Sequence, residues 1–142
     1  MPLRFRVHQL LTPLKNKEIV TIMRIAITSM GKSIESDIDP RFGRAAYFVI
    51  VDPDTMAVEA VENTQNLNLA QGAGIQAGKT IIDNHVDVLI SGHCGPKAHK
   101  VLQAGGVKIL TGARGCVADA VSQYKKGELE VALEADVEGH WV

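Results

Sequence analysis

The stretch SGHCGPKAHK, residues 91–100, concentrates side chains that could bind a metal or an anion. His93, Cys94 and His99 offer imidazole and thiolate groups, which suit copper, zinc or iron–sulfur centres. Lys97 and two glycines in the same stretch would let a backbone turn approach a negatively charged ligand closely. An ordinary turn between a strand and a helix is the third interpretation. The choice among the three depends on where the fold places this stretch.

A metal site here would need ligands from elsewhere, because the sequence has no CxxC or HxxxH motif that would predict a closed zinc site. Cys116 follows a second expected strand at the position that matches Cys94, so the two thiols could share a metal or a redox role. Two separate thiols are the alternative. His99 falls on the flank of an expected helix and is predicted to be solvated. The candidate metal ligands are therefore His93, Cys94 and Cys116.

Three glycine-rich segments each precede an expected helix, namely 71–74, 91–96 and 111–116. The first turn of a helix has N–H groups without partners and carries the positive end of the helix dipole. In open α/β sheets, ligands bind beyond the carboxyl ends of the parallel strands. Three such helix starts at one rim predict an anion-binding cradle, with basic side chains supplied by Arg41, Arg44, Lys97 and Arg114. The alternative is that the glycines only close turns.

The elements that must position these segments alternate along the chain. The pattern predicts strands at 23–28, 46–52, 56–63, 86–91 and 107–112, and helices at 74–85, 96–106 and 116–127. Residues 46–62 have the pattern of an antiparallel hairpin, whereas the alternation of helices and strands over 71–126 predicts parallel strands. We therefore predict an α/β fold with a mixed sheet of about five strands and helices on both faces.

The composition narrows the class of protein. The chain has 142 residues, a length that favours one domain. Its net charge of −1 gives no sign of nucleic-acid binding. It has two cysteines and no apolar run long enough to cross a bilayer, so we expect a cytoplasmic protein without a disulfide framework or a membrane segment. We divide it into a basic extension (1–22), an α/β domain (23–129) and an acidic tail (130–142). Residues 63–71 are predicted to be a solvated connection, with a mobile lid as the alternative.

The order of several motifs resembles the dinitrogenase iron–molybdenum cofactor biosynthesis family, which includes nitrogenase accessory proteins and small domains of the orange protein type. The motifs lie in residues 23–28 (MRIAIT), 39–52 (DPRFGRAAYFVIVD), 72–81, 86–109 and 115–129. The resemblance implies a three-layer, ribonuclease-H-like fold. It also implies that the chain binds, and carries or delivers, an anionic metal–sulfur cluster that contains molybdenum with iron or with copper.

The resemblance also implies site residues. Arg41, Phe42, Gly43 and Arg44 match the loop motif of the family, and its glycine positions are matched by Gly72, Gly74, Gly92, Gly95 and Pro96. His93 and Cys94 fill the two variable positions between Gly92 and Gly95. With Lys97, Gly112 and Arg114, these residues make up the expected cluster-binding set. Neither enzymatic turnover nor a particular donor or recipient protein is implied. A thiol-based redox protein using Cys94 and Cys116, or a module that binds nucleotides or phosphate, are the alternatives.

Overall fold

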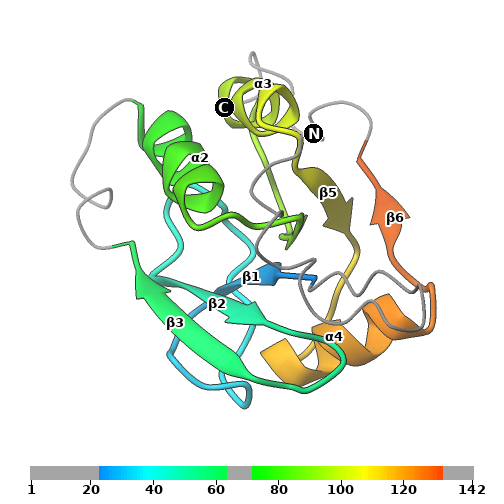
Figure 1. The fold of residues 1–142 in the computed structure, drawn as a ribbon. Helices are drawn as coiled ribbons and strands as arrows, with labels where there is room; N and C mark the ends of the chain where they lie inside the picture. Colours follow the sequence, from blue (N-terminus) through cyan, green and yellow to red (C-terminus); the bar gives the residue numbers. More distant parts are fainter. Residues whose placement is uncertain (1–22, 64–71, 133–142) are drawn as a thin grey trace, which may run out of the picture.

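A computed structural model of the chain describes residues 23–63 and 72–132, and these residues form one six-stranded sheet (Figure 1). The strand order is β3-β2-β1-β4-β5-β6. The strands are β1 (Ile25–Ser29), β2 (Tyr47–Val51), β3 (Val58–Glu62), β4 (Val88–Ile90), β5 (Lys108–Thr111) and β6 (Glu130–Val131). The sheet is mixed: β1, β4 and β5 run parallel, whereas β2, β3 and β6 pair antiparallel with their neighbours.

The predicted hairpin and the predicted parallel strands are confirmed. In the hairpin, Tyr47 pairs with Glu62 and Val51 pairs with Val58. The sheet has one strand more than the five expected, because β6 pairs with β5 through Leu110 and Thr111. Its two residues, Glu130 and Val131, open the segment that we predicted to be an acidic tail. A strand of two residues is too short to show a hydrophobic period.

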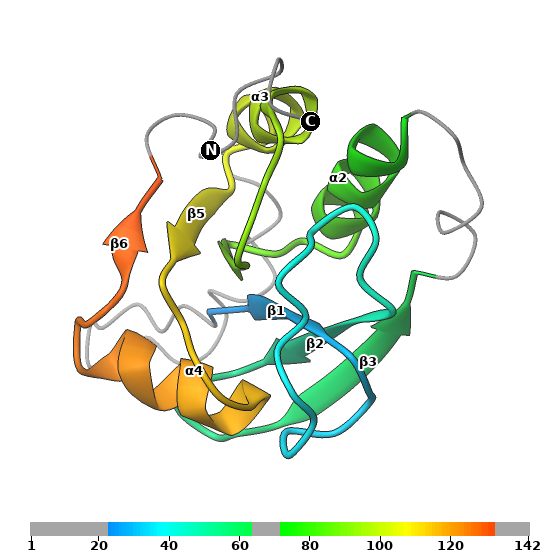
Figure 2. The ribbon, with the colours of Figure 1, turned by 180° about the vertical axis from the view of Figure 1, so that it is seen from behind.

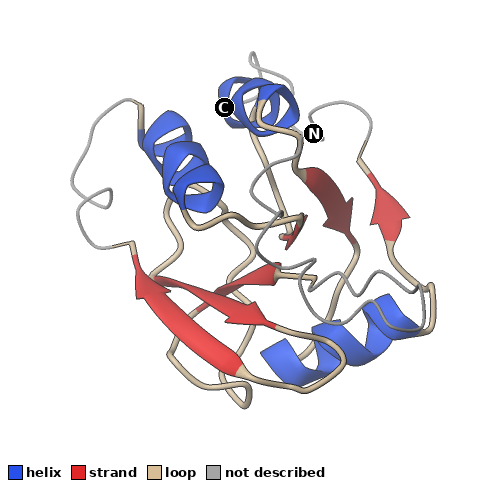
Figure 3. Cartoon of the chain, in the orientation of Figure 1, coloured by secondary structure: helices blue, strands red, loops and turns tan. Residues whose placement is uncertain are grey.

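Helices lie on both faces of the sheet, as predicted (Figures 1 and 2). Helices α2 (Ala73–Asp83) and α3 (Pro96–Ala104) lie side by side on one face, and α4 (Val117–Lys125) lies on the other (Figure 3). Each face therefore has its own apolar core. The core under α2 and α3 includes Phe48, Ala77, Leu89 and Leu102, and the core under α4 includes Ile25, Val49, Val117 and Val121.

The central strand β1 shows why the sequence folds in three layers. All five residues of IAITS are buried, because both of its faces are covered. Ile25 and Ile27 face α4, and Ala26 between them faces α2 and α3. The edge strand β3 is mostly exposed and carries two charged residues, Glu59 and Glu62. In the part of the chain that the structure describes, no helix is both long and apolar enough to span a bilayer.

Candidate functional site

The parallel strands β1, β4 and β5 end at one rim of the sheet, and the loop that follows β1 runs along this rim. At its start this loop contacts the first turn of α4, where the amides of Val117 and Ala118 donate to the carbonyls of Ser36 (2.9 Å) and Ile34 (2.8 Å). Further along, it contacts the turn between β4 and α3, and then the first turn of α2. One connection thus contacts the start of each of the three helices that the structure describes.

The family motif in this loop lies against the turn that contains the His–Cys pair. The amide of His93 donates to the Pro40 carbonyl (2.7 Å), and the amide of Phe42 donates to the His93 carbonyl (3.1 Å). The Phe42 side chain is buried and packs against Phe48, with 5.6 Å between the ring centroids. A Cβ atom on Gly92 would lie only 2.7 Å from the Pro40 carbonyl oxygen, so glycine permits this close approach. The motif loop at residues 41–44 therefore lies beside the turn that contains Gly92 and His93.

The first turns of α2 and α3 are adjacent and point the same way. A Cβ on Gly74 would lie 3.1 Å from the Ala98 Cβ, and a Cβ on Gly78, one turn later, would lie 3.0 Å from Val101 Cγ1. Contacts that advance together along both helices show that the helices are parallel. Gly43 of the loop is equally close, since its Cβ would lie 3.0 Å from Gly74 Cα. Small residues thus bring two helix starts and the motif loop into contact.

These two helix starts, residues 72–75 and 95–98, form what we call the two-helix cradle. The first-turn amides of Ala73, Gly74, Ile75, Lys97 and Ala98 have no hydrogen-bond acceptor within the described residues. Two parallel helix dipoles add their positive ends at the same place. Among the described residues, a Cβ at Gly72 or Gly95 would meet no atom within 4 Å, so these residues leave open space in front of the helix starts. The cradle is therefore suited to an anion.

The third helix start does not belong to this cradle, which corrects our prediction of three converging ends. Helix α4 lies on the opposite face of the sheet, and the loop carbonyls already occupy the amides of Val117 and Ala118. The turn before α4 is also fastened to its own helix, because the Gln123 side chain bonds both the amide and the carbonyl of Arg114 (3.1 and 2.9 Å). Gly112, Arg114 and Cys116 thus precede a helix on the other face, although the Ile38 amide donates to the Gly115 carbonyl (3.1 Å) and keeps their turn against the rim loop.

The ionisation of Asp119, in the first turn of α4, links the stability of the fold to pH. The amide of Cys116 donates to Asp119 Oδ2 (3.0 Å), and this bond, followed by that of the Cys116 side chain, lowers the pKa of Asp119 below its ordinary value. A carboxylate with a depressed pKa in the folded state stabilises the fold above its unfolded pKa, and this contribution is lost as the pH falls through the folded pKa.

We therefore expect Asp119→Ala to be less stable than the wild type at neutral pH, with the difference shrinking as the pH falls below about 4. Urea unfolding across this pH range measures the difference. Asp119→Asn, which keeps an acceptor oxygen but cannot ionise, should differ from Asp119→Ala by an amount that does not change with pH. A wild-type advantage that is unchanged in strong acid would contradict the assignment.

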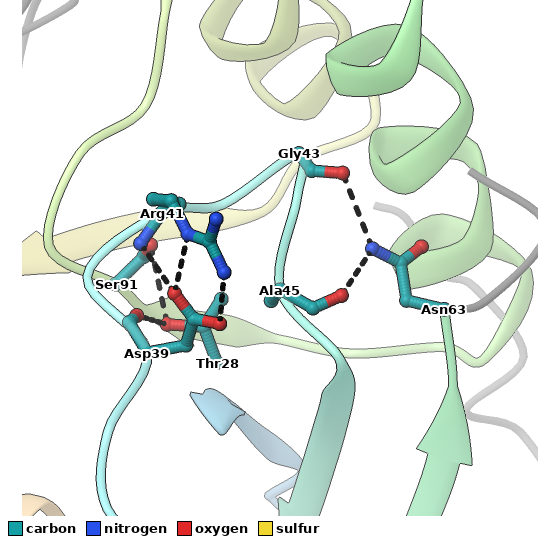
Figure 4. Close-up of polar contacts among 7 residues, drawn as sticks. All are labelled: Thr28, Asp39, Arg41, Gly43, Ala45, Asn63 and Ser91. Atoms are coloured by element: carbon teal, nitrogen blue, oxygen red, sulfur yellow. Dashed lines mark hydrogen bonds and ion pairs between the residues drawn. The ribbon is translucent and has the colours of Figure 1, made fainter. Parts of the chain in front are cut away.

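Arg41 lies at the rim but is already engaged by a carboxylate. Its Nε and Nη2 atoms donate to the two carboxylate oxygens of Asp39 (3.1 and 3.2 Å), and its amide donates to Asp39 Oδ1 (3.0 Å; Figure 4). These contacts raise the pKa of Arg41, first through the side-chain hydrogen bond and then through the charge of Asp39. The Asp39 side chain is 1% exposed and that of Arg41 is 60% exposed. The pair thus holds an oriented guanidinium that still faces solvent.

His93 and Cys94 do not share one binding space, which corrects the prediction that both could reach the same ligand. The His93 side chain is exposed, whereas Cys94 is 1% exposed and belongs to the core under α2 and α3. Adjacent residues of an extended turn point to opposite sides, so one side chain faces solvent and the other faces the core. Of the two, His93 is the side chain that a ligand at the rim can reach.

The two cysteines lie in different parts of the fold. Cys94 packs in the core on the α2–α3 face, whereas Cys116 is the N-cap of α4 and pairs with Asp37 of the rim loop. Both are thiols rather than a disulfide. Within residues 23–63 and 72–132, no group of three or more His, Cys, Asp or Glu side chains could hold a metal ion. The geometry gives no support to a site shared by Cys94 and Cys116.

His99 is not solvated, contrary to the prediction. It is 5% exposed, and its Nε2 lies 3.1 Å from the carbonyl oxygen of Ala132, just beyond β6. The residue that follows the unexpected sixth strand therefore covers this flank of α3. Lys97, in the first turn of the same helix, is exposed.

Sequence reasoning overlooked two buried polar residues, Asp39 and Asn63. Asp39 holds Arg41, as described above. Asn63, which we assigned to a solvated connection, is fully buried and bonds the backbone of the rim loop at Gly43 and Ala45 (Figure 4). The other residues of that predicted connection, 64–71, lie outside the described residues, as do the extension 1–22 and residues 133–142.

Comparison with known proteins agrees with this architecture. The sequence model described as dinitrogenase iron–molybdenum cofactor matches residues 23–127. The structure of the apo form of the orange protein from Desulfovibrio gigas is 40% identical and superimposes with a TM-score of 0.78, over 81% of this chain and 97% of that one. A comparison with curated protein sequences gives no match.

Two further solved structures extend the comparison. A candidate NifB protein from Thermotoga is 36% identical with a TM-score of 0.68, over 78% of this chain and 93% of that one. A candidate dinitrogenase from Methanocaldococcus jannaschii, at 19% identity and a TM-score of 0.61, covers 81% of this chain and 99% of that one, and shows a shared fold only.

Proposed function

Because the chain belongs to the dinitrogenase iron–molybdenum cofactor family, we propose that it binds and carries an anionic metal–sulfur cluster containing molybdenum with iron or copper. The cluster is its cargo, held for transfer between a donor and a recipient protein in the cytoplasm. We assign no catalytic step to the chain. The resemblance to the orange protein supports this proposal over the nucleotide-binding and thiol-redox alternatives.

The observation that carries the proposal is the two-helix cradle. A metal–sulfur cluster with net negative charge is stabilised by first-turn amides and by the positive ends of helix dipoles, without a full set of covalent ligands. The first turns of α2 and α3 provide both at one place, with open space at Gly72 and Gly95. The absence of a multi-ligand metal group from the described residues is compatible with this mode of binding.

Three side chains would complete the cradle. Arg41 supplies a guanidinium whose orientation is held by Asp39 and whose charge is retained at every physiological pH. Lys97 supplies a second positive charge at the start of α3, and His93 supplies an imidazole, which is a suitable ligand for copper or iron. Cys94 would act from the core by packing, and would not bind the cargo.

The test is an anaerobic titration of the ligand-free protein with tetrathiomolybdate, with and without copper(I), followed by visible absorption. We expect new bands at a fixed stoichiometry. Gly95→Leu places a bulky side chain at the start of α3 and should abolish these bands by blocking the cradle. A Cβ at this position would meet no atom of the described residues within 4 Å, so the variant should still fold. Ala104→Leu adds a side chain of the same size at the exposed, opposite end of α3, so it is the matched control.

The outcomes separate the proposal from its alternatives. Bands that persist in Gly95→Leu would show that the cluster binds elsewhere. If wild-type spectra remain the sum of the free components, and an iron–molybdenum cluster also fails to bind, the carrier function is wrong. Competition by inorganic phosphate at equal concentration would favour a general phosphate site over a site for sulfide clusters.

A further inference from the structure

The end of strand β3 is tied to the rim loop by one fully buried side chain, that of Asn63. Its backbone amide continues the hairpin by donating to the Ala46 carbonyl (3.0 Å). Its side-chain Nδ2 then donates to two loop carbonyls, those of Ala45 (2.8 Å) and Gly43 (3.2 Å; Figure 4). An amide nitrogen has two hydrogens, so these two bonds use the whole donor capacity of the group.

These bonds fasten a stretch of backbone that has no sheet partner of its own. Residues 43–45 lie between the contact of Phe42 with His93 and the start of β2 at Tyr47. Ala45 is buried, and a buried carbonyl without a donor costs free energy comparable to a lost hydrogen bond. The Asn63 carboxamide therefore sets the path of the loop just after the family motif.

The path of the loop matters because Gly43 touches the cradle. A Cβ on Gly43 would lie 3.0 Å from both the Cα and the N of Gly74, and 3.3 Å from the Ala73 carbonyl carbon. Because Gly43 has no Cβ, its backbone packs directly against the backbone of the first turn of α2, with no flexible side chain between them. We therefore expect a displacement of Gly43 to disturb the first turn of α2 or the neighbouring segment that carries Arg41.

The geometry points to Asn63 as a positioning residue of the two-helix cradle: its carboxamide holds Gly43 against the start of α2. The expected effect on binding rests on the proposed function. Asparagine is required because an ionised aspartate of the same shape has no donor, and serine has only one.

We test this with Asn63→Ala and Asn63→Asp, compared with Val121→Ala as a control. Val121 is 2% exposed in the core under α4, on the opposite face of the sheet, so its truncation destabilises the fold without touching the cradle. The first readout is the amide chemical shifts of Gly43 and Gly74, measured on folded, ligand-free protein. The second is the affinity for tetrathiomolybdate with copper(I), measured by titration of the folded protein.

We expect both Asn63 variants to move the Gly43 and Gly74 amide signals and to weaken thiomolybdate binding about tenfold, as is typical when a partner outside the ligand shell is removed. Val121→Ala should leave both readouts unchanged at a similar loss of stability. Unmoved signals, or an affinity equal to that of Val121→Ala, would overturn the inference. If the wild type itself binds no thiometallate, the proposed function fails, and the amide signals alone decide whether Asn63 positions the loop.

Discussion

Gly92→Ala will lower the free energy of unfolding by about 2–3 kcal/mol, the cost of overpacking a tight contact. The new Cβ would lie 2.7 Å from the Pro40 carbonyl oxygen and 2.8 Å from Pro40 Cα, both of which are backbone atoms. Neither can rotate away, and the Pro40 carbonyl also accepts the amide of His93 at 2.7 Å. Relief of the clash therefore requires the rim loop to separate from the turn between β4 and α3. Urea or thermal unfolding measures the effect.

Gly95→Ala is the matched control, because it makes the same substitution three residues later in the same turn. A Cβ on Gly95 meets no atom of residues 23–63 or 72–132 within 4 Å, and its backbone, at φ −68° and ψ 170°, suits alanine. The free energy of unfolding should stay unchanged or rise by up to about 1 kcal/mol, because alanine restricts the unfolded chain. Equal losses for the two variants would show that the turn is intolerant of any side chain, and that the contact with Pro40 is not the cause.

The layers of the fold could be predicted because the hydrophobic pattern of each helix or strand is visible within its own segment of the sequence. The mostly apolar residues 86–91 and the helical spacing of residues 74–85 are examples. The parallel arrangement then follows from the general rule for alternating strands and helices, and the structure confirms it. Strand β6 could not be predicted in this way, because its two residues depend on β5 for their pairing.

The candidate site was only partly predictable, because its missing parts depend on contacts distant in sequence. Asn63 bonds residues 18 and 20 positions earlier, and no local pattern signals such a bond. The first-turn amides of α4 are occupied by a loop about eighty residues away, which removed that helix from the predicted cradle. His99 is buried by Ala132, 33 positions later. Asp39 differs, because its spacing of two residues from Arg41 is a local signal of their ion pair that is visible in the sequence.

Asp39→Ala should lower the free energy of unfolding by about 2 kcal/mol, since bonds to a charged acceptor are among the stronger ones and Asp39 is almost fully buried. Three donors of Arg41 lose their acceptor at once: the backbone amide, Nε and Nη2. The Asp39 backbone is also bonded to β1, because the Thr28 hydroxyl donates to its carbonyl (2.6 Å) and lies 3.3 Å from the Ser91 hydroxyl (Figure 4). This backbone contact survives the substitution, so the chain should still fold.

A double-mutant cycle shows whether Asp39 acts through Arg41. If the carboxylate serves mainly to orient the guanidinium, Arg41→Ala should add little to the loss already caused by Asp39→Ala, in both stability and thiomolybdate affinity. Arg41→Lys should recover the charge but not the affinity, because an ammonium cannot span both carboxylate oxygens and still present a second edge to a ligand. Strictly additive losses would mean that the two residues act separately. Asp39 would then stabilise the loop only, and Arg41 would contribute its charge to thiomolybdate binding without needing Asp39 to orient it.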